Sequence, residues 1–183
     1  MKILSEKMVY TLEYAGTIDI LTGIEDFETN ELEFVEFWHT YKLNGKIIPS
    51  VTTLLDTGEY INVSEEILEY ARKKGTLVHK EIEEYLKENK YGFTQEFEEF
   101  VRLFQTHNNL FNQVAIFDIK TYSSNSKDKI EKCYKQEIMY GTGVKYLTSK
   151  EVKHHYEIWL PHNKKGRIID LDEYMKGNKV EYK

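Results

Sequence analysis

The sequence has a single cysteine, only two prolines and no long hydrophobic run. The lone Cys133 excludes an internal disulfide and a zinc site built from cysteines, and it favours a reducing, cytosolic setting. So few prolines exclude a collagen-like or proline-rich disordered chain. No apolar run approaches the roughly 18 residues that a membrane-spanning helix needs, and the N-terminus has no secretion signal. We therefore expect a cytoplasmic protein that does not enter a membrane.

The composition is that of an ordinary globular protein. Of the 183 residues, 40% are hydrophobic and 31% are charged, and a chain of this length forms one domain with a sizeable core. We expect a single domain over residues 1–183. The formal charge of -6 argues against a protein that coats nucleic acid through bulk positive charge. It does not exclude a nuclease, because an active site that holds metal with carboxylates is itself acidic.

Charge is unevenly distributed along the chain. Residues 24–40 carry six acids and no lysine or arginine, so this segment should avoid phosphates. Residues 120–135 carry five lysines against Asp128 and Glu131. If nucleic acid binds, we expect its backbone to lie along this second segment. The lysines expected to contact DNA are Lys127, Lys129, Lys132 and Lys135.

The N-terminal half predicts two hairpins followed by two helices. Residues 8–14 and 17–22 are rich in β-branched and aromatic residues and flank Ala15-Gly16, the expected turn. A second hairpin is expected over 38–51, around Asn44-Gly45. Ser64 is the expected N-cap of a helix, and a further helix is expected over 94–109. The buried stripe predicted for the first helix is Ile67, Ala71, Gly75, Val78, Ile82 and Tyr85.

The C-terminal half predicts a buried strand over 113–120, which is apolar until Asp118. Further elements are a helix over 127–140, a short strand near 145–147, and strands at 156–160 and 167–171. The last dozen residues are expected to be peripheral, and residues 24–37 to be an acidic connection. These elements predict an α/β fold with a mixed central sheet flanked by helices.

Asp118-Ile119-Lys120 at the end of the buried strand is the most informative segment. Side chains two apart on a strand point the same way, so Asp118 and Lys120 share a face and Ile119 points to the other. A carboxylate that can bind Mg²⁺ and a cation beside it suit metal-assisted phosphodiester cleavage. The alternative, an ordinary salt bridge at a strand end, is the commoner meaning of this tripeptide.

Two further candidates come from other elements. Asp19 is the lone acid of the return strand of the first hairpin, and an acid inside a sheet is costly unless it is paired or binds metal. His79 lies one turn after Gly75, whose place on the buried stripe indicates a close neighbour. Glu83, at i+4, can orient the His79 ring or add an acid. A solvated edge residue and a surface histidine remain the alternatives for Asp19 and His79.

Gln136 and Tyr140 lie four apart on the helix that follows the Asp118 strand. With Lys129 and Cys133 they form a stripe that is distinct from the expected core stripe of Ile130, Tyr134 and Ile138. The amide and the phenol suit the holding of a nucleotide strand beside a metal. An amphipathic helix also contains such a pair by chance.

Together these segments resemble the PD-(D/E)xK phosphodiesterase superfamily, and within it the RecB-like and phage exonuclease branch. The resemblance covers most of residues 38–171 and the N-terminal hairpin. Its motifs are Tyr41–Leu55 with Ser-Val-Thr, Gly75-x-x-x-His79, Gly16-Thr-Ile-Asp19, Asp118-x-Lys120 and Gln136-x-x-x-Tyr140.

The resemblance implies a restriction-endonuclease-like core and a set of roles. The Asp19 and Asp118 carboxylates, the backbone carbonyl of Ile119 and the His79 ring would hold Mg²⁺ or Mn²⁺, with Lys120 as the catalytic lysine. Gln136 and Tyr140 would steady the DNA strand or the lysine. Glu6 is a further candidate, since some relatives carry a glutamate before the hairpin.

The order of the motifs departs from the family. There the hairpin with the second acid follows the histidine helix and directly precedes the Asp-x-Lys strand, whereas here it is N-terminal. Sheet pairing depends on neighbours in space, so the rearrangement is permissible if residues 24–37 span about 3.3 Å each. Pairing of the hairpin with another subunit, or an incomplete site, stays open.

The hypothesis is a DNA nuclease that depends on Mg²⁺ or Mn²⁺, and the resemblance favours an exonuclease. One alternative is an inactive DNA-binding or scaffolding protein with the same fold, with a homo-oligomer or protein partner. Another is an acidic protein-interaction module in which the motifs are coincidental. Abundant tyrosine, lysine, isoleucine and asparagine fit an AT-rich genome, such as that of a phage acting in a bacterial cell.

Overall fold

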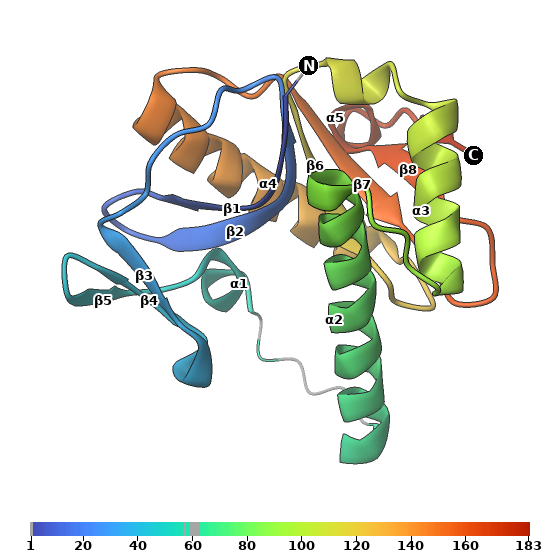
Figure 1. Ribbon diagram of the computed structural model, residues 1–183, viewed down its shortest axis with the longest axis horizontal. Helices are drawn as coiled ribbons and strands as arrows, with labels where there is room; N and C mark the ends of the chain where they lie inside the picture. Colours follow the sequence, from blue (N-terminus) through green and yellow to red (C-terminus); the bar gives the residue numbers. More distant parts are fainter. Residues whose placement is uncertain (1, 57, 59–62) are drawn as a thin grey trace.

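The computed structural model describes residues 2–56, 58 and 63–183. Its centre is a six-stranded sheet in the order β1-β2-β6-β7-β8-β9 (Figure 1). The β6–β7 pair is parallel and the other pairs are antiparallel, so the expected mixed sheet is confirmed. The strands are β1 (Ile3–Tyr10), β2 (Ala15–Thr22), β6 (Ala115–Lys120), β7 (His154–Trp159), β8 (Arg167–Asp170) and β9 (Glu181–Tyr182).

Helices cover both faces of this sheet. α2 (Glu65–Glu88) and α3 (Gln95–Thr106) lie on one face, and α4 (Lys127–Thr148) and α5 (Leu171–Met175) on the other (Figure 1). The alternation of β6 explains both contacts, since Phe117 and Ile119 pack toward α2 and α3 while Ile116 packs toward α4. The long helices begin at side-chain caps, as the sequence predicts for α2: Ser64, Thr94 and Ser126 each accept a backbone N–H.

A smaller sheet packs beside the first hairpin. It contains β3 (Leu32–Val35), β4 (Thr40–Leu43) and β5 (Lys46–Ile48), and the short helix η1 (Glu36–Trp38) links β3 to β4. The predicted turn at Asn44-Gly45 is confirmed, with φ of 50° and 80°. The strand β3 lies within the segment that the sequence indicated as a connection. The described residues also form the short helices α1 (Val51–Leu54) and η2 (Leu110–Asn112).

Three local predictions differ from the structure. The turn of the first hairpin is at 11–14, because Ala15 and Gly16 are already paired with Tyr10 and Val9 in β2. The strand expected near 145–147 is instead the last turn of α4, which no proline interrupts and which ends where Ser149 takes a left-handed φ of 60°. The tail after residue 171 contains most of α5 and the edge strand β9.

The predicted stripe of α2 is buried only in its second half. Val78 and Ile82 are in the core, whereas Ile67 is 58% exposed and Ala71 is exposed, because the N-terminal half of the helix extends beyond the sheet (Figure 1). The close neighbour of Gly75 is the Thr121 hydroxyl. Among the described residues, none of the helices has the length and apolar character needed to cross a membrane.

Candidate functional site

The site begins where β2 separates from β6. The ladder pairs Thr22 with Ala115 and Ile20 with Phe117, and it stops at Asp19. At this point the backbone N–H of Ile119 donates to a side chain: the acceptor is Asp19 Oδ2, at 2.7 Å. The N-terminal hairpin therefore lies beside the Asp118 strand, as the rearranged motif order requires.

Glu6, Asp19 and His79 form a compact group from β1, β2 and α2. One ligand atom of each lies within 4.8 Å of the others, and Asp19 Oδ1 is 3.4 Å from His79 Nδ1. Glu6 faces Asp19 across the hairpin, because the pairs on either side are Ser5 with Ile20 and Lys7 with Ile18. Its φ of 50° is uncommon for a residue other than glycine. We call these three residues the ligand trio.

The electrostatics of the ligand trio are those of crowded, partly buried groups. Burial and then the charge of Asp19 raise the pKa of Glu6 to about 7. Burial disfavours the charged form of His79, but the charge and hydrogen bond of Asp19 outweigh it and raise the His79 pKa to about 9. Burial likewise opposes ionisation of Asp19, and His79 overcomes it and lowers the Asp19 pKa.

This donor set fits a divalent cation. Two carboxylates held together repel each other, and a cation between them removes that repulsion. Carboxylate oxygens are the ligands that Mg²⁺ prefers, and Mn²⁺ also accepts an imidazole nitrogen. Binding through His79 would displace the proton that Asp19 now stabilises on the ring.

Asp118 and Lys120 face α4 and form a tight ion pair, with Nζ 2.6 Å from Oδ2. Ile119 packs on the opposite face, as alternation predicts. The Cys133 thiol donates to the same Asp118 oxygen at 3.2 Å. Burial raises the pKa of Asp118 although Lys120 opposes the shift, whereas for Lys120 the charge of Asp118 outweighs burial and raises the pKa.

Gln136 of α4 contacts this ion pair, and Tyr140 contacts Gln136 in turn. Lys120 Nζ donates to Gln136 Oε1 at 3.5 Å, and Gln136 Nε2 donates to the Tyr140 hydroxyl at 2.8 Å. Both side chains are buried against the sheet, whereas Ile138 of the expected core stripe is 39% exposed. The predicted core stripe is therefore wrong at Ile138, because α4 turns Cys133, Gln136 and Tyr140 to the sheet.

The site has two parts, the ligand trio and the Asp118–Lys120 pair, which adjoin at Ile119. No acid belongs to both parts. In the described part of the chain, the ligand trio is the only group of at least three metal-ligating side chains this close, and Asp118 is outside it. The halves are nonetheless near enough that Asp19 raises the pKa of Asp118 and Asp118 raises that of His79. Asp118 is paired with Lys120 rather than directed at the trio.

Two buried acids that the sequence did not single out lie behind Asp118. Glu157 of β7 is fully buried, stands opposite Asp118 in the parallel register, and accepts hydrogen bonds from Asn125 and Tyr122. Glu137 of α4 is also fully buried, and neither carboxylate oxygen has a hydrogen-bond partner among the described residues. The sequence feature that could have identified Glu157 is its position as the only acid in the otherwise apolar run 156–160.

A cavity of about 370 Å³ opens beside the ligand trio. It includes Ser50, Val51 and Thr52, the Ser-Val-Thr segment of the resemblance, and none of its described lining residues is a lysine or arginine. Its lining residues are Glu6, Gly16, Thr17, Asp19, Phe34, His39, Tyr41, Ser50, Val51, Thr52, His79 and Tyr140.

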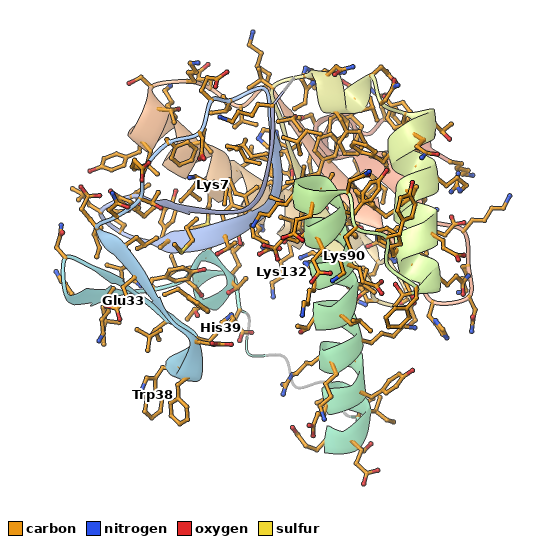
Figure 2. The ribbon with its side chains drawn as sticks, viewed as in Figure 1. Lys7, Glu33, Trp38, His39, Lys90 and Lys132 are labelled. Carbon is orange, nitrogen blue, oxygen red and sulfur yellow. The ribbon has the colours of Figure 1, made fainter. Side chains whose placement is uncertain are left out.

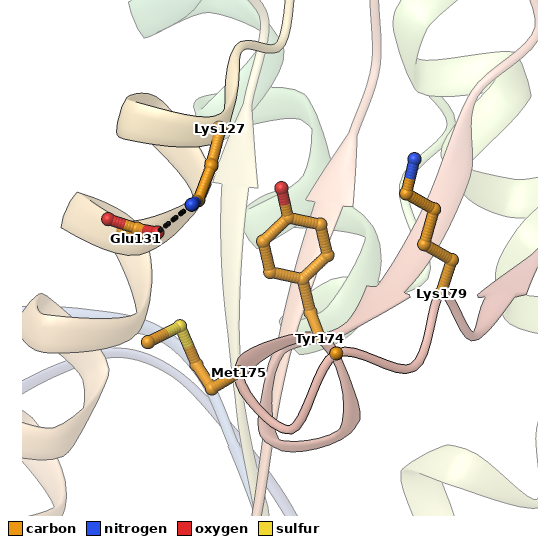
Figure 3. A pocket seen from close by; sticks show the side chains of 6 residues that line it. Lys127, Glu131, Tyr174, Met175 and Lys179 are labelled. Carbon is orange, nitrogen blue, oxygen red and sulfur yellow. Dashed lines mark ion pairs between the residues drawn. The ribbon is translucent and has the colours of Figure 1, made fainter.

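The remaining candidates lie on the surface of α2 and α4. Glu83 pairs with Lys87 at 2.5 Å, one turn beyond His79. The four lysines expected to contact DNA, Lys127, Lys129, Lys132 and Lys135, are all exposed on α4. Lys127 pairs with Glu131 at 3.5 Å beside a second cavity of about 460 Å³, which Tyr174 and Lys179 also line (Figure 3).

Comparison with protein-family models found no matching family, and comparisons with curated proteins and with solved structures found no significant match. The family resemblance therefore depends on the motif residues alone. The folded chain brings these residues to the end of β6 in two adjoining groups, the ligand trio and the Asp118–Lys120 pair.

Proposed function

We propose that this chain is a DNA nuclease that hydrolyses phosphodiester bonds with Mg²⁺ or Mn²⁺. The observation that supports it most strongly is the ligand trio at the end of β6, one peptide unit from the Asp118–Lys120 pair. Although the motif order differs from that of the family, Asp19, Asp118 and Lys120 all lie at the same end of β6. The restriction-endonuclease-like core and the preference for an exonuclease rest on the sequence resemblance.

Each part of the site has its own proposed role in hydrolysis. Glu6, Asp19 and His79 would hold the cation, with the Ile119 carbonyl as a neighbouring oxygen donor, and Asp118 would hold Lys120 in place. A bound divalent cation lowers the pKa of water and offsets charge on the scissile phosphate. Lys120 is positioned by Asp118 and Gln136 to offset charge that develops on the phosphate. The exposed lysines of α4 would contact the DNA backbone, so binding should weaken with salt.

The test is digestion of linear single-stranded and duplex DNA in Mg²⁺, Mn²⁺ or EDTA. We expect metal-dependent cleavage by the parent and none by Asp19→Asn or Lys120→Ala. Asp128→Asn is the matched control, because Asp128 is an exposed acid of α4, and it should cleave at the parental rate. DNA binding without cleavage would indicate the scaffolding alternative, and neither binding nor cleavage would indicate an acidic interaction module.

Metal binding can be measured without activity. A cation at about 100 times its dissociation constant adds about 2.7 kcal/mol to stability, which for a chain of this size raises Tm by about 5 to 10 °C. We expect this shift in the parent and in Asp128→Asn, and its loss in Asp19→Asn and Glu6→Gln. An unchanged shift in both trio variants would place the cation elsewhere.

We also propose a cytoplasmic location, since the one thiol, Cys133, is buried and forms no disulfide.

A further inference from the structure

The loop between β7 and β8 presents two lysines at the end of the sheet where the site lies. Residues 161–166 read PHNKKG, and both lysines, Lys164 and Lys165, are exposed. The Leu160 N–H donates to the backbone carbonyl of Lys120 at 2.8 Å, so the loop begins next to the last residue of β6. It therefore leaves the sheet at the same end as Lys120 and the ligand trio. We call residues 161–166 the basic loop.

Two acids of α3 hold the basic loop in place. Glu96 is only 2% exposed, and its Oε1 lies 3.0 Å from Nδ1 of His162. At the other end of the loop, Glu99 Oε2 accepts the backbone N–H of Gly166 at 2.8 Å. Since both ends are bonded to α3, the backbone that carries the two lysines keeps a defined position beside the sheet.

These two acids are neutralised by cations other than the lysines of the basic loop. Lys74 Nζ is 2.6 Å from Glu96 Oε1, and Arg102 Nη2 is 2.8 Å from Glu99 Oε2. In the described part of the chain, the two loop lysines themselves form no ion pair. Their two positive charges are therefore available to an anion that approaches from solvent.

The basic loop lies within a few nucleotides of the proposed cation site. His162 contacts Lys74 of α2, and His79 of the ligand trio follows Lys74 by five residues on the same helix. Five helical residues extend about 7.5 Å along the helix axis. The phosphates of one DNA strand repeat about every 3.4 Å along the duplex axis. A strand with its scissile phosphate at the trio therefore has further phosphates within reach of the loop, about two or three nucleotides away.

The charges on the other side of the ligand trio have the opposite sign. The strand order places the N-terminal hairpin and the basic loop on opposite sides of β6, and the smaller sheet packs beside the hairpin. Residues 24–40 of that region carry six acids and no lysine or arginine. Glu33 lies on the smaller sheet (Figure 2), across the view from β7 and β8 (Figure 1). Phosphates are repelled on the first side and attracted on the second, so a bound backbone should extend from the trio toward the basic loop.

We propose that the basic loop binds the phosphate backbone of DNA next to the bond that is cut, through Lys164 and Lys165. This inference rests on the proposed nuclease function and adds a contact to those expected of the α4 lysines. Contacts to phosphates carry no sequence information. Binding through the loop should therefore be independent of sequence and should weaken with salt.

The first test is the affinity for a labelled duplex of about 20 base pairs, measured by fluorescence anisotropy at several salt concentrations. Ca²⁺ at a fixed concentration replaces Mg²⁺, and electrophoresis confirms that the DNA stays intact. Each phosphate contact contributes about 0.9 to the slope of log K against log salt. The double variant Lys164→Ala/Lys165→Ala should therefore lower the slope by about 2 and weaken binding up to about 60-fold at about 0.1 M salt.

The matched control removes two lysines from the opposite end of the same strand pair. Lys150 and Lys153 are exposed, and the Lys153 N–H donates to the carbonyl of Val114 at 3.0 Å, beside the start of β6. Lys150→Ala/Lys153→Ala changes the net charge by the same amount as the loop variant. Because these lysines lie away from the ligand trio, we expect parental affinity and a parental salt slope.

The second test needs no variant. The parent is acetylated with an amine-reactive reagent in the presence and absence of the duplex, and mass spectrometry measures the modification of each lysine. We expect DNA to protect Lys164 and Lys165, because bound phosphates cover their amines. Lys150 and Lys153 should react equally with and without DNA.

Parental affinity and salt slope in the loop variant would overturn the inference, as would equal weakening by the control pair. Unprotected loop lysines in the DNA complex would do the same. Tighter binding of oligoglutamate than of DNA by the loop would identify an acidic protein as its partner instead. Failure of the proposed function looks different: loop-dependent binding of DNA would persist, and no DNA would be cut in Mg²⁺ or Mn²⁺.

Discussion

Replacement of Glu157 by glutamine should stabilise the protein at alkaline pH. Burial, and then the charge of Asp118, raise the pKa of Glu157 from 4.5 to about 7. Below pH 4.5 the carboxyl is protonated in both the folded and the unfolded chain and has no effect. Between pH 4.5 and 7 the unfolded chain loses its proton first, so the folded state loses stability as the pH rises. Above pH 7 the loss is complete and amounts to about 3 kcal/mol.

Glutamine stays neutral at every pH and keeps the contacts of the carboxyl. Its amide oxygen can accept from Asn125, and the Tyr122 hydroxyl can turn to accept from its amide nitrogen. We therefore expect Glu157→Gln to gain up to about 3 kcal/mol at pH 8 and under about 1 kcal/mol at pH 5. At pH 8 the Tm should rise by about 6 to 12 °C.

Urea unfolding in EDTA, followed by the fluorescence of the buried Trp159, measures both free energies. Glu98→Gln is the control, because Glu98 is exposed on α3 and its replacement should change stability by under about 0.5 kcal/mol. A gain for Glu157→Gln of equal size at both pH values would refute the reasoning, as would no gain at pH 8.

Two other changes test how the site is supported. In Gly16→Ala the new methyl would lie 2.3 Å from Cε1 of the buried Tyr140, so the ring must move; we expect a loss of about 1 to 3 kcal/mol in urea unfolding and slower DNA digestion. Parental stability and rate would mean that the ring is free to shift. Glu81 is buried and accepts the Phe93 N–H at 2.9 Å and a hydrogen bond from the Thr94 hydroxyl. Glu81→Ala should cost about 1 to 3 kcal/mol because the partly buried donors of Phe93 and Thr94 lose their acceptor, and Glu81→Gln should cost less; equal losses in the two variants would contradict this.

Local patterns predicted the residues that depend on one element. Asp118 and Lys120 share a face because alternation along a single strand decides it, and the structure pairs them at 2.6 Å. The Asn44-Gly45 turn follows from the backbone preferences of two residues. The placement of Asp19 beside β6 came from the resemblance, since no local pattern specifies which strands pair across the chain.

Glu6 was a candidate only through the resemblance, and no local pattern predicted its position beside Asp19. Its place opposite Asp19 is set by the hairpin register, and a turn at Ala15-Gly16 would pair Glu6 with a residue beyond β2. The short strands β3 and β9 have too few residues for a readable period. The exposure of the first half of α2 was not predicted, because a stripe of apolar residues shows which face of a helix can pack but not how much of its length packs against the sheet.

The position of β2 between β1 and β6 has a consequence for the growing chain. Ile20 pairs with Phe117, so during synthesis the hairpin leaves the ribosome long before its inner edge has a partner. Until β6 emerges, the apolar strand around Ile18 and Leu21 offers free N–H and C=O groups to any other extended chain. The same pairing that brings Asp19 to the end of β6 therefore leaves the nascent protein with an exposed apolar strand edge until residue 120 has emerged.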